Sequence, residues 1–310
     1  MKKLRLLLIA ALALVLAVSV GMLIRQNIQY REGEEAYAEA EALVELPDLS
    51  QLPRPEPVPE EAPSEEEIAP EEQPVYVDPY ADALRNMDFS ALREVNSDVL
   101  GWILIPGTAV SYPVVQGTDN DYSLNHTWKK WTSLVGSIFL ECHNSRDLSD
   151  FNTIIYGHRM NNGSMFASLK NYKKQSWWSD HPCVYITDDS GSHKYEIFAA
   201  YEVSTEGETY RLGFGSDREK QAFIDYCLAQ SVIDTGVVPR TYDRILTLST
   251  CTGQGHATRW VVQAVLRGEA PQEAEAPLEE LPPEEEEKKA PSALDIALGR
   301  ATGKAEEPAS

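Results

Sequence analysis

The sequence has little positive charge: among its 310 residues, 27 lysines and arginines stand against 49 aspartates and glutamates, for a formal net charge of −22. A chain this acidic would repel a phosphate backbone, which argues against nucleic-acid binding. The acidity is concentrated in residues 31–80 and 269–310, with net charges of −14 and −8. Residues 81–268 carry only −4, and they are numerous enough to form one packed domain.

Signals for metal binding and disulfides are also scarce. The chain has four cysteines, no CxxC pair, no HExxH segment and no internal repeat, so the usual spacings of a zinc site are missing. Cys183 opens an apolar segment, and Cys227 lies on the apolar side of an expected helix. We therefore expect both to be small core residues. Cys142 follows a β-rich segment, and its sequence context fits a packing role and a reactive role equally.

Residues 6–24 are nineteen apolar or small residues in a row. At about 1.5 Å per residue, a helix of this length matches the roughly 30 Å hydrocarbon layer of a membrane. The run continues to Arg25 without a small-x-small cleavage site, which favours an uncleaved anchor over a cleaved signal peptide. Basic residues precede it and acidic residues follow it. The positive-inside rule then predicts a single-pass protein of the cell membrane, with residues 1–30 as cytoplasmic N-terminus and anchor and the domain on the extracellular side.

The two acidic segments have the composition of linkers. Residues 51–80 hold eight of the chain's 19 prolines. Residues 31–80 are therefore predicted to be an extended, self-repelling extracellular spacer, with a frayed helix over residues 31–46. Residues 269–310 have the same character and are predicted to be a disordered acidic tail. We expect neither segment to supply core or catalytic groups.

Residues 81–268 contain short segments rich in β-branched and aromatic residues, which is typical of strands. The eight predicted strands are residues 99–105, 111–116, 136–141, 152–157, 183–187, 194–203, 244–250 and 259–266. Short helices are expected over residues 80–96, and one longer helix over residues 217–230 lies between strands six and seven. Many strands with few helices predict a mainly β fold with a closed or nearly closed eight-stranded barrel.

Three chemically reactive residues fall at the ends of predicted strands. Cys251 follows the strand over residues 244–250, where its thiol should emerge from a rigid strand into a loop. Arg259 opens the next strand eight residues later, so a hairpin would place a cation beside the sulfur. A neighbouring guanidinium lowers a thiol pKa and can donate to an oxyanion. His158 ends another strand. Taken singly, each residue is more typical of a structural role; together they suggest the rim of an active site.

Four segments resemble the class B sortases, the membrane-bound cysteine transpeptidases of Gram-positive bacteria. They are DNDYSLNH (119–126), GSIFLECHN (136–144), NTIIYGHRMNNGSMFASLKNY (152–172) and LTLSTCTGQGHATRWVVQA (246–264). The resemblance implies an eight-stranded sortase barrel with N-terminal helices, and it implies Cys251, His158 and Arg259 as the catalytic residues. Positions of the family's substrate groove carry over to Asn120, Leu124, Tyr156, Ser249 and Thr250. The chain departs from the family at Arg159, where Asn is frequent, and in the loop TGQGHAT.

The implied reaction is a two-step acyl transfer without a cofactor or metal. The thiolate would cleave a C-terminal sorting motif of secreted proteins after Thr, and an amine would then resolve the acyl-enzyme. The expected amine belongs to a lipid-linked peptidoglycan precursor; the alternative is a pilin lysine, which would make the enzyme a pilin polymerase.

Three other functions remain open from the residues. A metal-binding module would use Cys142, His143, His158, Cys251 and His256. A non-catalytic surface scaffold would bind partners through its acidic segments. A hydrolytic cysteine peptidase of the papain type would instead order its groups Cys, His, Asn, whereas here a His precedes the Cys.

Overall fold

The computed structural model describes residues 2–55, 78–251 and 257–267. The chain divides into two compact units, Met1–Ala270 and Pro271–Ser310. The second unit lies outside the described residues, and so do residues 56–77 of the predicted spacer and the predicted tail.

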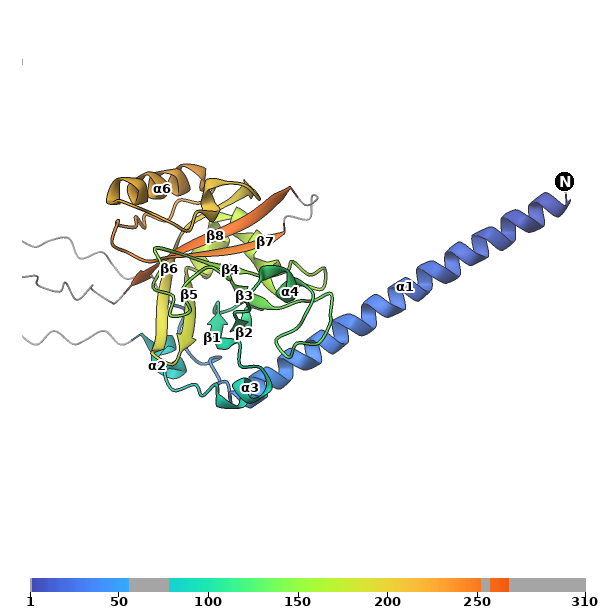
Figure 1. The fold of residues 1–310 in the computed structure, drawn as a ribbon, viewed down its shortest axis with the longest axis horizontal. Coiled ribbons are helices and arrows are strands. Elements are labelled where there is room, and N and C mark those ends of the chain that lie inside the picture. Colours follow the sequence, from blue (N-terminus) through green and yellow to red (C-terminus); the bar gives the residue numbers. More distant parts are fainter. Residues whose placement is uncertain (1, 56–77, 252–256, 268–310) are drawn as a thin grey trace, which may run out of the picture. The chain divides into compact units, whose positions relative to one another are not determined.

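Eight strands close into a barrel in the order β1-β2-β3-β4-β7-β8-β6-β5 (Figure 1). Two neighbouring pairs, β2–β3 and β4–β7, are parallel, and the other pairs are antiparallel. The mainly β prediction is confirmed, and each predicted strand is present. Their bounds are β1 Val99–Leu104, β2 Ser111–Val115, β3 Ile138–Leu140, β4 Asn152–Tyr156, β5 Cys183–Asp188, β6 Gly191–Ser204, β7 Ile245–Cys251 and β8 Thr258–Arg267.

The helices cover the barrel and its connections. They are α1 Lys2–Leu43, α2 Pro79–Leu84, α3 Ser90–Val95, α4 Asn120–Leu124, η1 Phe166–Lys173, α5 Gln175–Asp180, η2 Glu208–Tyr210 and α6 Asp217–Gln230. The predicted helix over residues 217–230 is confirmed as α6, which lies between β6 and β7 as expected. It is N-capped by Ser216, whose side chain accepts from the backbone N–H of Glu219, and it buries Phe223, Ile224 and Cys227 against the barrel.

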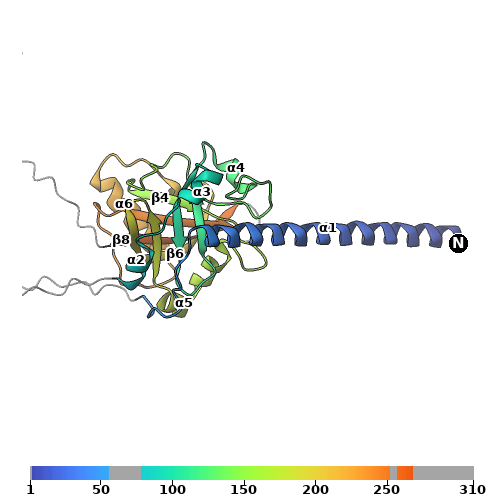
Figure 2. The same ribbon diagram turned by 90° about the horizontal axis from the view of Figure 1, so that it is seen from below.

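Helix α1 runs without a break from the apolar segment into the barrel domain. Within the described residues it is the one helix long and apolar enough to cross a membrane, and its apolar window is fully exposed. Its C-terminal end lies against α3 and β2 (Figure 2). A single-pass anchor is compatible with this helix.

The last turns of α1 pack on the barrel through a stripe of mostly small residues. Gly33, Ala36, Tyr37 and Ala40 are buried, with the helical spacing i, i+3, i+4 and i+7. A Cβ at Gly33 would lie 2.7 Å from a methyl carbon of Val135, so glycine permits the close approach. The Tyr37 hydroxyl donates to the carbonyl of Gly136 at 2.6 Å. The start of the acidic segment is therefore packed helix, contrary to our expectation that the segment contributes nothing to the core.

Two described cysteines are fully buried thiols, as expected. Cys183 lies in β5 and Cys227 in α6, and both are free. Burial raises the pKa of Cys183 to about 12 and that of Cys227 to about 11. Both are therefore protonated packing residues at neutral pH.

Candidate active site

Three adjacent strands, β4, β7 and β8, bring the three predicted catalytic positions to one end of the barrel, called here the three-strand edge. The parallel β4–β7 pair aligns Tyr156 with Ser249, and the backbone N–H of Gly157 donates to Ser249 at 3.1 Å. His158 and Cys251 each lie two residues beyond this aligned pair. The antiparallel β7–β8 pair sets Cys251 opposite Arg259. The sheet register alone thus gathers the three backbones, although the side chain of Cys251 is outside the described part of the structure.

The His158 ring is held by a backbone carbonyl. Its Nε2 lies 2.7 Å from the carbonyl oxygen of Leu124. A carbonyl only accepts, so Nε2 carries a hydrogen and donates it. Gly136 makes room for the ring, because a Cβ there would lie 2.8 Å from His158 Cδ2 and 2.7 Å from the Leu124 oxygen. Gly136 also has φ +63°, a conformation that favours glycine.

Arg259 is the second residue of β8 and precedes Trp260, which contacts a lysine. Its Nη1 donates to the carbonyl of Thr258 at 3.1 Å, and its side chain is partly buried. The next residue, Trp260, is buried and carries the ammonium of Lys173 4.9 Å from its ring centre. The backbone of Arg259 is therefore held in a strand, which restricts where its guanidinium can lie.

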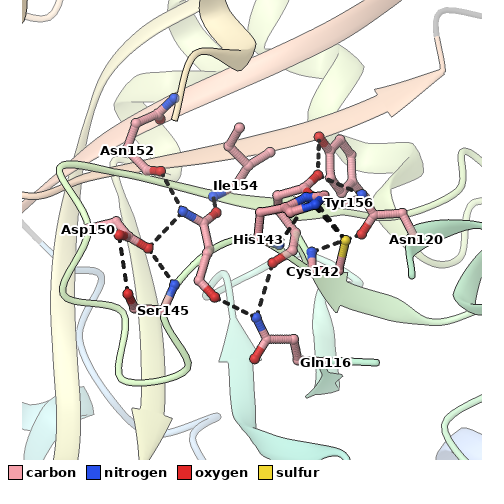
Figure 3. A network of polar contacts seen from close by, with 11 residues as sticks. Gln116, Asn120, Cys142, His143, Ser145, Asp150, Asn152, Ile154 and Tyr156 are labelled. Carbon is pink, nitrogen blue, oxygen red and sulfur yellow. Dashed lines mark hydrogen bonds and ion pairs between the residues drawn. The ribbon is translucent and has the colours of Figure 1, made fainter. Parts of the chain in front are cut away.

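Two of the predicted substrate-groove residues meet at a carboxylate that the sequence analysis did not single out (Figure 3). Asn120 Nδ2 donates to Glu141 Oε2 at 2.6 Å, and the Tyr156 hydroxyl donates to the same oxygen at 3.1 Å. Glu141 is buried, at 6% exposure. Burial would raise its pKa, but hydrogen bonds from His143, Asn120 and Cys142 outweigh that effect and the pKa is lowered.

The remaining groove positions lie on β7 and α4. Ser249 Oγ is 2.9 Å from the hydroxyl of Tyr210, and the Tyr210 ring stacks 6.3 Å from that of Tyr156. Leu124 supplies the carbonyl that holds His158. Thr250 Oγ1 is buried and has no hydrogen-bond partner within the described residues. Tyr210 was missed because nothing in its local sequence marks it; only the fold brings it to Ser249.

Of the five residues of the metal-binding alternative, His256 and the side chain of Cys251 lie outside the described residues. Among the three that the structure describes, Cys142 and His143 meet, and they do so together with Glu141. Burial and the Glu141 carboxylate raise the pKa of the Cys142 thiol. Cys142 therefore lacks the low pKa expected of a nucleophile.

Comparison with known proteins assigns the chain to a family. The sequence model of the Sortase domain family matches residues 103–267, more than half of the chain, and the chain belongs to that family. Sortases are cysteine transpeptidases, and this chain is an enzyme of that kind. Its relatives place it more narrowly among the class B sortases.

Three comparisons carry that narrower assignment. Sortase B of Staphylococcus aureus (strain NCTC 8325 / PS 47) is 36% identical over 163 residues, which cover 53% of this chain and 67% of the relative. Sortase B of Listeria monocytogenes serovar 1/2a (strain ATCC BAA-679 / EGD-e) is 38% identical over 160 residues, covering 52% and 65%. The Staphylococcus aureus sortase B–substrate complex superposes with a TM-score of 0.56 at 34% identity, covering 59% of this chain and 85% of that chain.

Proposed function

We propose that Cys251 is the nucleophile, His158 the general acid and base, and Arg259 the oxyanion donor. The observation that carries the proposal is the shared edge of β4, β7 and β8, where the sheet register gathers these three positions. A thiolate needs a nearby cation and a proton donor to cleave an amide, and this edge offers both.

The first step forms an acyl-enzyme. The Cys251 sulfur attacks the carbonyl carbon of a Thr in a C-terminal sorting motif, and the Arg259 guanidinium donates to the developing oxyanion. The leaving amine takes a proton from His158. Because Leu124 engages Nε2–H, the transferred proton comes from Nδ1 of the imidazolium.

The second step transfers the acyl group to an amine, with His158 as base. We infer an amine of a lipid-linked peptidoglycan precursor as the acceptor, with a pilin lysine as the alternative. The substrates would be secreted proteins, and we infer an extracellular domain to meet them; α1 is long and apolar enough to serve as its anchor. Asn120, Leu124, Tyr156, Ser249 and Thr250 would line the groove for the sorting motif; Glu141 fixes two of these side chains. The similar Staphylococcus aureus sortase B has been solved as a complex with substrate, which supports a substrate groove in this fold.

The test uses the full chain in detergent and a panel of peptides that end in candidate sorting motifs. Mass spectrometry should detect a peptide fragment ending in Thr as a thioester on Cys251. Cys251→Ala should abolish cleavage without unfolding the barrel, because the residue ends a strand. His158→Ala should slow turnover about 100- to 10,000-fold. Cys142→Ser is the matched control and should retain turnover, because that thiol is not at the three-strand edge.

Turnover by the Cys251→Ala variant, or an acyl group found on Cys142, would overturn the assignment. The acceptor is identified in a second arm, in which a peptidoglycan cross-bridge amine and a lysine peptide compete for the acyl-enzyme. Preference for the lysine peptide would favour pilin polymerisation.

A further inference from the structure

Three consecutive residues after β3 bring a carboxylate, a thiol and an imidazole together. Glu141 Oε1, Cys142 Sγ and His143 Nδ1 all lie within 4.8 Å of one another. The sulfur is 3.4 Å from Oε1 and 3.3 Å from Nδ1, and Oε1 is 2.8 Å from Nδ1. Figure 3 shows the Cys142 sulfur beside the His143 imidazole. The three donors come from consecutive residues, so their convergence depends on the local backbone path.

That backbone path is fixed by several hydrogen bonds. The backbone N–H of Glu141 donates to Ile154 in β4 at 2.8 Å, and its carbonyl accepts from Gln116 Nε2 at 3.1 Å. The backbone N–H of Cys142 donates to Asn120 Oδ1 at 3.0 Å. Both residues are thus tied to the barrel and to α4. The donors are arranged by the fold before any ligand arrives.

The separations suit one face of a tetrahedral metal site. Bonds of roughly 2.0–2.3 Å from Zn²⁺ to N, O and S ligands put neighbouring donors about 3.3–3.8 Å apart in a tetrahedron. Two of the three separations fall in that range, and the third needs an opening of about half an ångström. The His143 side chain is 77% exposed while that of Glu141 is 8% exposed, so an ion can enter from solvent and keep water as its fourth ligand.

Glu141 can bind an ion without giving up its partners in the proposed groove. Its Oε1 faces Cys142 and His143, whereas its Oε2 accepts from Asn120 and Tyr156. Hydrogen bonds of this kind behind a ligand orient it and typically contribute 10- to 100-fold in metal affinity. The two oxygens of one carboxylate therefore serve two neighbouring sites.

We propose that Glu141, Cys142 and His143 form an auxiliary binding site for a thiophilic divalent cation, with Zn²⁺ as the best match, next to the proposed substrate groove. Thiolate and imidazole ligands favour zinc over magnesium and calcium. On binding, the Cys142 thiol proton is released to solvent and a sulfur–metal bond forms. The His143 imidazole binds through Nδ1 as the neutral ring, with its hydrogen on Nε2. No oxidation or reduction is involved.

The test measures Co²⁺ binding to the full chain in detergent, in a Cys251→Ala background that removes the proposed catalytic thiol. A cobalt–thiolate charge-transfer band in the near ultraviolet reports sulfur ligation, which carboxylates of the acidic segments cannot produce. We expect one Co²⁺ per chain with this band, displaced by one equivalent of Zn²⁺. Adding Cys142→Ser should abolish the band. Adding Tyr156→Phe, which removes an outer hydrogen bond, should weaken binding about 10- to 100-fold.

His193→Gln is the matched control, since His193 also faces a carboxylate, that of Asp188, with 3.4 Å between Nε2 and Oδ1. Its band should be unchanged. Absence of the band in the Cys251→Ala protein, its survival after Cys142→Ser, or equal loss after His193→Gln would overturn the proposal. Because binding is measured in a chain without Cys251, a failure of the proposed catalytic mechanism would leave this result unaffected.

Discussion

Tyr37 offers the most direct test of whether the end of α1 belongs to the barrel domain. Its ring is 6% exposed and meets the ring of Tyr112 edge-on, with 5.1 Å between centroids. Its hydroxyl donates to the carbonyl of Gly136 at 2.6 Å. Gly136 in turn makes room for the ring of His158. One side chain of α1 is therefore linked both to the core and to the loop beside the proposed active site.

The expected magnitudes follow from what each substitution removes. Tyr37→Phe loses one hydrogen bond, at a net cost of about 0.5–1.5 kcal/mol in the free energy of unfolding. The cost rises to roughly 1–3 kcal/mol if the Gly136 carbonyl finds no other donor. Tyr37→Ala also removes a buried ring, and deletions of large aromatic side chains cost about 3–5 kcal/mol. For a domain of this size each kcal/mol lowers the melting temperature by about 2–4 °C, so we expect a drop of roughly 6–20 °C.

The assay is thermal and urea unfolding of the full chain in detergent, followed by tryptophan fluorescence. Tyr242→Ala is the matched control, because that tyrosine is 54% exposed and its removal should change stability by no more than about 0.5 kcal/mol. Equal midpoints for Tyr37→Ala and the wild type would refute the packing of α1 on the barrel. A large loss for Tyr242→Ala would show that the assay does not distinguish buried from exposed residues.

Three further predictions concern the flank, the arginine and the buried thiols. A chain lacking residues 1–29 should fold and turn over peptide. A chain lacking residues 1–80 should melt at a lower temperature, because it loses the buried residues of α1. Equal melting temperatures for the two truncated chains would contradict this prediction. Arg259→Lys should slow single-turnover acylation about 100- to 1,000-fold, because Lys keeps the charge but not the planar set of donors. The pKa of Cys251, measured from the rate of thiol alkylation as a function of pH, should move little. A near-normal acylation rate would leave Arg259 with only an electrostatic role. Burial raises the pKa of Cys227 from 9.0 to about 11, so the contribution of the neutral thiol to stability is complete below pH 9.0 and is lost as pH rises through about 11. The urea midpoint should therefore fall less over this pH range in Cys227→Ala than in the wild type. Parallel curves for the two proteins would contradict the prediction.

Most of the barrel could be predicted from sequence because its strands are short, β-branched and bounded by turn residues. The packed end of α1 could not. Its buried face consists of Gly33, Ala36, Tyr37 and Ala40, which give a weak hydrophobic signal among many glutamates. A face of small residues is recognised only when the partner surface that it approaches is known.

The candidate site was likewise predicted only in part from the sequence. His158, Cys251 and Arg259 stand out in sequence because each adjoins a predicted strand end, and the observed register aligns those ends. Glu141 does not stand out, because a carboxylate at the end of a strand usually faces water. Its burial depends on Asn120 and Tyr156, which reach it from α4 and β4, and no local pattern encodes that meeting.

The parallel pairing of β4 with β7 ties the proposed catalytic arrangement to the completion of folding. Between these neighbours the chain passes through β5, β6 and α6, so their pairing closes a long loop and is slow to form. Before the barrel closes, the chain holds a thiol and an imidazole that are far apart. A substitution that loosens this strand pair should therefore reduce the fraction of molecules that are active, while each correctly folded molecule keeps its full rate.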